Sequence, residues 1–472
     1  NALGAATTGD DNVAIGRLAL GAGVTTGGVN IAIGATAGDA ITSGACNIAL
    51  GLNALTAATD NCDNIAIGRN ALAVSANDAD GNIAIGTIAM GGADVSGAQN
   101  IAIGSTAMDA LTSGACNVAI GTDALGAATI GLKNIAIGQL AMSGVTTGQA
   151  DSNIAIGVSA LVGAAGTTGN SNVAIGTNAM DALTTGACNI AIGDNALGAA
   201  TDNHENIAIG KSALATSNGD GDNNIAIGNQ ALGGADVSNC NNIAIGSVTM
   251  DALTTGACNI AMGIGSLGTA TIANRSIAIG EGSMLDITTG NFNDNIGIGR
   301  HTLRGSSSTT NSHCNVAIGQ SAMYAVTSGG FNVAVGSSAL GAITSGSANV
   351  AIGKDAIKAA TIGVNNVAIG CCVMAGVTTE QVDKNVGIGS NALYGSASTT
   401  GDENVAIGTD TLYAITTGIK NIAIGLQAAD ALTTGGENIA IGPNAFGAGT
   451  EGSGNIAIGN GPMNSAVTGG CN

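Results

Sequence analysis

Aromatic and charged residues are scarce in this chain, and tryptophan is absent. Aromatic residues make up 1% and charged residues 9% of the 472 residues. A nucleic-acid interface needs clustered basic residues, whereas this chain has 11 basic against 31 acidic residues and a formal charge of −20. We therefore expect neither nucleic acid nor an anionic membrane surface as a partner.

Long hydrophobic runs and enzyme motifs are also missing. No stretch approaches 18 consecutive apolar residues, so we expect no insertion into a membrane. No Cys-x-x-Cys pair, phosphate-binding loop or basic aromatic patch occurs, and the three histidines, His204, His301 and His313, have no Ser/Asp constellation around them. We expect no enzymatic activity and no catalytic or cofactor-binding residues.

What the chain has in abundance is a short repeat. The residues Asn12-Val13-Ala14-Ile15-Gly16 return nearly unchanged about every 17 residues, giving 26 copies up to Asn455, with Ser276 as the one substituted anchor. Self-similarity at a fixed short period indicates one structural unit stacked on itself. We number the positions of each copy from its anchor Asn as position 1.

The repeat predicts a β-solenoid. Positions 1–5 alternate and are rich in β-branched residues, as strands are, and a second apolar stretch covers positions 8–12. Glycine interrupts every run within about ten residues, which excludes helices. We predict an all-β chain, a parallel β-solenoid (β-roll) of about 26 coils of 17–20 residues, with two short strands per coil and residues 1–472 as a single continuous solenoid.

Alternation leaves open which side of the first strand faces inward. We expect the Ile or Val residues of positions 2 and 4 in the core, and the Ala of position 3, as at Ala66, Ala84 and Ala102, on an outward face for self-association. The alternative is that this small Ala packs against the second strand of its own coil. The anchors are expected to form an asparagine ladder along the coils, as at Asn30, Asn47, Asn64 and Asn82.

A longer period lies inside the short one. The segment Asp109–Asn117 recurs at Asp181–Asn189 and Asp251–Asn259, so the chain is built from four-coil blocks of 70–73 residues. The chain opens and closes within a coil without a polar capping repeat at either end. We expect either a piece of a longer fibre or chains that stack end to end.

The motif resembles the head repeats of YadA-like trimeric autotransporter adhesins and similar repeats of phage or virus tail fibres. The resemblance is carried by segments such as Asn172–Gly176, Asn315–Gly319 and Asn404–Gly408 and covers essentially the whole chain. It implies a left-handed parallel β-roll, three chains around one axis, and display outside a cell or virion for attachment. The coils here are longer than those of the adhesins, and no coiled-coil stalk or anchor strands are present.

Cysteines and acidic loops are the candidate sites. Cys46 with Cys62, and Cys240 with Cys258, fall on adjacent coils at nearly the same position, within reach of a disulfide; small buried thiols are the alternative for the other cysteines. The loops with Asp78 and Asp80, and with Asp220 and Asp222, alternate oxygen ligands and glycine as calcium loops do, although neither offers a bidentate Glu. Solvated turns are the alternative.

The function predicted from these features is a structural or adhesive extracellular fibre, as a filament subunit or fibre shaft on a cell or virion surface. Its expected partners are copies of itself, as a homotrimer or end-to-end filament, and a cell-surface or glycan receptor. Tyr324, Tyr394 and Tyr413, with three phenylalanines, lie in the C-terminal half and suggest a contact stripe. The alternative is an ice-binding solenoid, motivated by pairs such as Thr25-Thr26 and Thr184-Thr185.

Overall fold

The protein is an all-β solenoid built from parallel strands, one for each anchor. A computed structural model describes residues 2–4, 8–21, 24–75, 79–145, 150–163, 168–217, 221–238, 240–287, 292–305, 311–378, 382–396, 399–463 and 469–471. The chain divides into two compact units, Asn1–Cys240 and Asn241–Asn472, and each is described by itself. One continuous solenoid over the whole chain therefore stays a prediction.

The first unit holds thirteen strands of three residues in the part of the chain that the structure describes. They are β1 (Val13–Ile15), β2 (Ile31–Ile33), β3 (Ile48–Leu50), β4 (Ile65–Ile67), β5 (Ile83–Ile85), β6 (Ile101–Ile103), β7 (Val118–Ile120), β8 (Ile135–Ile137), β9 (Ile154–Ile156), β10 (Val173–Ile175), β11 (Ile190–Ile192), β12 (Ile207–Ile209) and β13 (Ile225–Ile227). Each strand from β1 to β12 pairs in parallel with the strand of the next coil, in the register of the repeat, so that Ala191 lies beside Ala208.

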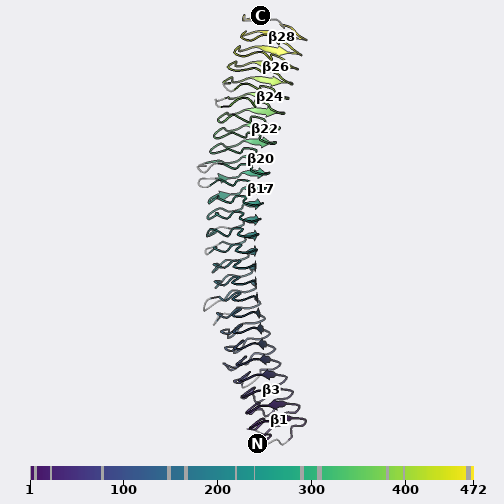
Figure 1. The fold of residues 1–472 in the computed structure, drawn as a ribbon, viewed down its shortest axis with the longest axis vertical. Helices are drawn as coiled ribbons and strands as arrows, with labels where there is room; N and C mark the ends of the chain where they lie inside the picture. Colours follow the sequence, from purple (N-terminus) through teal and green to yellow (C-terminus); the bar gives the residue numbers. More distant parts are fainter. Residues whose placement is uncertain are drawn as a thin grey trace. The chain divides into compact units, whose positions relative to one another are not determined.

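The second unit repeats this sheet and adds a small one. Its main strands are β14 (Ile243–Ile245), β15 (Ile260–Met262), β17 (Ile277–Ile279), β19 (Ile296–Ile298), β20 (Val316–Ile318), β21 (Val333–Val335), β22 (Val350–Ile352), β23 (Val367–Ile369), β24 (Val386–Ile388), β25 (Val405–Ile407), β26 (Ile422–Ile424), β27 (Ile439–Ile441) and β28 (Ile456–Ile458). Two-residue strands β16 (Ala273–Asn274) and β18 (Phe292–Asn293) pair separately. In Figure 1 the arrows of β20 to β28 lie one above another, one per coil.

The second apolar stretch of the coil is not a strand, contrary to the expectation of two strands per coil. Across the described residues it forms turns. The cause is visible in the coil that starts at Asn189, where Asn195 and Leu197, at positions 7 and 9, have φ of 56° and 52°. Left-handed residues at alternate positions curl the backbone, so this stretch bends back instead of extending.

The glycine of position 5 is required where the strand ends. Gly193 has φ of 141°, and a Cβ atom there would lie 2.4 Å from the carbonyl oxygen of Gly210 in the next coil. Any side chain would therefore separate the two coils. The glycine column sets how closely the strands of successive coils approach at this corner.

The core is narrow and filled by small and medium side chains. Ala191 at position 3, Ala196 at position 8 and Leu197 at position 9 are all fully buried. In the preceding coil, Leu183 at position 12 is fully buried as well. The left-handed conformation of Leu197 costs roughly 1–2 kcal/mol, and it directs the side chain into this core, where its burial offsets that cost.

Candidate functional site

The anchor asparagines form the polar edge of the core and fix the register of the strands. The Oδ1 atom of Asn30 accepts hydrogen bonds from the backbone N–H and the Nδ2 of Asn47, both at 3.0 Å. Oδ1 of Asn47 in turn accepts the backbone N–H of Asn64 at 3.0 Å, and Oδ1 of Asn64 accepts that of Asn82 at 2.8 Å. All four side chains are buried, so the ladder predicted from the sequence is present and satisfies polar groups that water does not reach.

The strand faces are oriented opposite to the first expectation. The Ala of position 3 is buried in the core, as Ala66, Ala84 and Ala102 show with 0% exposure, whereas Ile192 and Ile209 at position 4 are 37% and 36% exposed. An outward alanine strip is therefore wrong. The core beneath the strand is already occupied by the side chains of positions 8, 9 and 12, which leaves room for a methyl group but not for two β-branched residues.

Two columns of branched aliphatic side chains consequently face outward along each unit. Position 2 is partly exposed in nearly every strand, and position 4 is still more exposed in many of them, with β4, β6, β7, β9, β11 and β12 all showing the same pattern. In the second unit Ile369, Ile407 and Ile441 are 36–37% exposed. At about 4.8 Å per coil, thirteen coils extend this apolar surface over about 60 Å. We call these residues the outward aliphatic face.

The cysteines are offset in register. Cys46 lies one residue before its anchor and Cys62 two residues before, so Cys62 is next to Ala45, whose N–H donates to the Cys62 Sγ at 3.4 Å. The expected bridge is not formed, and both Cys46 and Cys62 carry free thiols. Cys240 and Cys258 lie two residues and one residue before their anchors, and no disulfide joins them either.

The aspartates of the two acidic loops have a structural partner in the preceding coil. Oδ1 of Asp80 accepts the backbone N–H of Cys62, and Oδ1 of Asp222 accepts that of His204, both at 2.7 Å. Asp78 and Asp220 lie outside the described residues, so calcium binding there stays a prediction. Among the residues that are described, no group of three or more His, Cys, Asp or Glu is placed to hold a metal ion.

Threonine hydroxyls of the turn bond to the solenoid itself. Thr184 donates its Oγ1 hydrogen to the carbonyl of Thr201 at 2.7 Å, and Thr25 and Thr26 donate to carbonyls of the next coil at 3.4 and 3.3 Å. These hydroxyls link neighbouring coils. The pairs that motivated the ice-binding alternative thus have a role in stabilising the stack.

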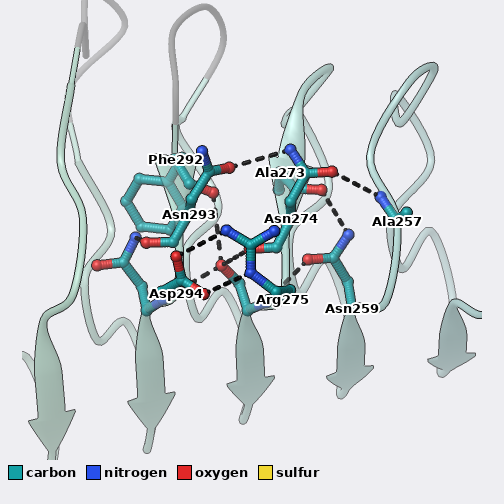
Figure 2. A network of polar contacts seen from close by, with 10 residues as sticks. Ala257, Asn259, Ala273, Asn274, Arg275, Phe292, Asn293 and Asp294 are labelled. Atoms are coloured by element: carbon teal, nitrogen blue, oxygen red, sulfur yellow. Dashed lines mark hydrogen bonds and ion pairs between the residues drawn. The ribbon is translucent and has the colours of Figure 1, made fainter.

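A polar network marks the coils around β16 and β18 (Figure 2). Arg275 binds Asp294 through two hydrogen bonds, Nε to Oδ1 at 2.7 Å and Nη2 to Oδ2 at 2.9 Å. Beside this pair, Nδ2 of Asn274 donates to Oδ1 of Asn293 at 3.0 Å. The hydrogen bond from Arg275 holds the pKa of the Asp294 carboxyl below its ordinary value and raises the pKa of Arg275. The network bridges coils at the one place where serine replaces the anchor.

Aspartates recur at position 10 of every fourth coil in the first unit. Burial raises the pKa of the Asp109 and Asp181 carboxyls, and the Asp123 carboxylate adds to the effect at Asp109. In the second unit the same position carries Tyr324, Tyr394 and Tyr413. These tyrosines are far apart in the chain, and only their position relative to the anchors indicates that all three belong to one column.

Comparison with known proteins adds no relative. A scan against models of protein families finds no match, and a search of curated proteins finds none either. The likeness to adhesin and tail-fibre repeats therefore rests on the repeat motif alone. Across the described residues, no helix is long and apolar enough to cross a membrane.

Proposed function

We propose that this chain forms a non-enzymatic, extracellular structural fibre whose copies associate side by side through the outward aliphatic face. The observation that carries this proposal is the continuity of that face over all thirteen strands of each unit. The largest apolar patches on ordinary monomeric proteins measure roughly 300–600 Å², and a surface about 60 Å long and two side chains wide is at the upper end or beyond.

A second copy is the partner that best matches this face. Both columns repeat at the rise of the coil, about 4.8 Å, and a partner has to present apolar groups at the same spacing to pack against all of them. Another solenoid of this chain meets that condition at every coil. The resemblance to trimeric adhesins implies three chains, and display on a cell or virion with a cell-surface or glycan receptor as the further partner.

The net negative charge of the chain opposes association between copies, so an attractive apolar face is needed to hold them together. With a formal charge of −20, copies repel one another at low ionic strength. Salt screens this repulsion, and sulfate also strengthens the burial of apolar surface. Association through the outward aliphatic face should therefore increase with sulfate, whereas association through ion pairs would decrease.

Sedimentation velocity on the purified chain tests the proposal. The wild type should sediment as an oligomer, and a variant with Ile120→Glu and Ile192→Glu should shift to monomer, because each glutamate is placed in the packed interface. The matched control is Ser113→Glu with Thr185→Glu, which adds the same charge at exposed turns of the adjoining coils. A wild type that is monomeric, or a control that dissociates equally, would contradict the proposal.

A further inference from the structure

The position-10 column of the second unit forms a groove that the fibre role does not explain. Two slots lie along it, one of about 370 Å³ beside Tyr324 and one of about 650 Å³ beside Tyr394. Lys358 borders both slots, so they are neighbours. Gly341 lies in the first slot and Ala375 in the second, each supplying a floor where a larger residue would fill the space.

A tyrosine ring lies at one end of each slot, and a neighbouring side chain outside the slot holds it in place. The rings of Tyr394 and Tyr413 stack with centroids 5.1 Å apart and planes at 11°, so Tyr413 covers the side of Tyr394 that is turned away from its slot. At the other end, the guanidinium of Arg304 lies 5.6 Å from the Tyr324 ring centroid and donates to its hydroxyl at 3.1 Å. Asp286 fixes Arg304 in turn, at 2.5 Å. Both rings are thus preorganised.

The rims of the slots carry hydrogen-bonding groups with little net charge. Ser321 and Ser338 line the first slot, and Asp355 and Thr361 line the second. Lys358 is paired with Asp355, whose Oδ1 lies 3.2 Å from its Nζ. The groove therefore offers flat aromatic faces together with paired donors and acceptors, in a chain whose overall acidity repels polyanions.

The repeat of these groups fits an extended polymer. Tyr324 and Lys358 are two coils apart, and so are Lys358 and Tyr394, which is about 9–10 Å in each case. A coil advances about as far as one sugar ring of an extended glycan. The apolar C–H face of such a ring carries the partial positive charge that the negative face of a tyrosine attracts, and its hydroxyls match the rim.

We propose that this groove, the tyrosine groove, binds an uncharged, unbranched glycan lying along the solenoid, with sugar rings against Tyr324 and Tyr394. This inference deepens the adhesive part of the proposed function, since it names the receptor class and its site. It does not depend on the outward aliphatic face, because the groove residues occupy positions 7, 10, 11 and 13 of the coil, away from the strand.

The experiment uses the tyrosines as their own probe. All three tyrosines of the chain lie in this column and tryptophan is absent, so tyrosine emission reports on the column that contains the groove. Emission and heat are followed while the full chain is titrated with cellohexaose, xylohexaose and chitohexaose as uncharged probes, and with an oligogalacturonate as the anionic probe. At least one uncharged probe should bind and change the emission, and the anionic probe should not.

Variants locate the binding. Tyr394→Ala should weaken it by ~10-fold or more, because a stacked ring and its buried area are lost, while Tyr394→Phe keeps the ring and most of the affinity. Ala375→Gln, which fills the slot and leaves both tyrosines in place, should weaken it too. The control is Phe331→Ala, an exposed aromatic residue next to an anchor and outside the groove, which should bind as the wild type does.

Sedimentation of the same variants separates this inference from the proposed function, because none of them touches the outward aliphatic face. Failure of every uncharged probe to bind the wild type would overturn the inference, and so would unchanged affinity of Tyr394→Ala. Binding of the oligogalacturonate alone would also overturn it. A wild type that sediments as a monomer would contradict the proposed fibre but not the binding of a glycan in the groove.

Discussion

The two units share their backbone but differ in what they present at position 10. In the first unit the described position-10 residues are small or acidic, such as Gly91, Asp109 and Asp181, apart from Val162. In the second unit the column keeps aspartates at Asp251 and Asp430 but also carries the larger side chains of Arg304, Tyr324, Lys358, Tyr394 and Tyr413. All six aromatic residues of the chain lie in that unit. The strand and the glycine corner are the same in both, and the ladder differs only where Ser276 replaces an anchor asparagine. In a repeat protein the shared positions hold the stack, and the differing positions are where recognition is to be sought.

The largest effects should come from the positions that the units share. Ala191→Asp in the first unit and Ala423→Asp in the second each place a carboxylate at a fully buried site without a partner, which should cost at least ~3 kcal/mol and open the surrounding coils. Hydrogen exchange read by mass spectrometry measures the loss of protection coil by coil. The two substitutions should have similar effects.

The adjacent outward residues provide the matched control. Ile192→Asp and Ile424→Asp carry the same charge on side chains that are 37% and 36% exposed, and in the dissociated chain they should change protection little. Greater loss of protection from the isoleucine substitutions than from the alanine substitutions would mean that the strand faces are reversed.

The ladder offers an intermediate test, because the second unit contains a natural defect. At Ser276 the hydroxyl accepts the backbone N–H of Asn295 at 3.3 Å, whereas Oδ1 of Asn189 accepts that of Asn206 at 2.9 Å. Asn189→Ala removes this acceptor from a buried N–H and should cost ~1–3 kcal/mol. Ser276→Asn should restore the ladder and stabilise its coils by about 1 kcal/mol.

Local protection against hydrogen exchange again measures both changes. Thr185→Ala, at an exposed turn of the coil before Asn189, serves as the control and should have little effect. If Ser276→Asn lowered protection, the ladder would not be a continuous stabilising element, and the serine would instead be required by the Arg275–Asp294 network beside it.

The smallest effects should appear with pH and should have opposite signs in the coils of Asp109 and Asp181 and in the coil of Asp294, whereas Asp430 of the second unit, whose carboxyl pKa is also raised by burial, should behave as Asp109 does. Folding raises the pKa of Asp109 and Asp181 above the ordinary 3.8, so the folded state binds protons more readily than the unfolded chain. Stability of their coils should increase as the pH falls from neutral towards 3.8 and gain nothing further below it. Asp109→Asn should be more stable than the wild type at neutral pH and lose part of this dependence.

In the second unit Asp294 has its pKa lowered from 3.8 by Arg275. The stability that it contributes is present above pH 3.8 and is lost as the pH falls further, through the folded-state pKa. Hydrogen exchange at a series of pH values, corrected for the intrinsic rate, compares the two regions. The same direction of change in the coils of Asp109 and of Asp294 would contradict the assignment.

The sequence was sufficient for the fold class and the strand register because both depend on the repeat alone. The five residues of the motif predicted the strand, and equal anchor positions predicted that Ala191 would lie beside Ala208, as it does. The orientation of the strand could not be obtained in this way. Alternation is symmetric about the sheet, and choosing the inner face requires knowing that positions 8, 9 and 12 already fill the core.

The prediction of a second strand in each coil was wrong for a related reason. Leucine and methionine at position 9 rarely adopt positive φ, so nothing in residues such as Leu197 or Met180 signals the left-handed conformation that both have, with φ of 52° and 53°. That conformation arises from stacking against neighbouring coils. The column of tyrosines could be predicted from the sequence, but only by numbering residues that are far apart in the chain by their position within each coil.

Electron cryo-microscopy of the assembled native material tests the central claim most directly. The account predicts several solenoids in cross-section, with the isoleucine and valine columns of neighbouring copies packed against one another and the tyrosine groove open to solvent. A single solenoid in cross-section, with the outward aliphatic face exposed to water along its length, would contradict it.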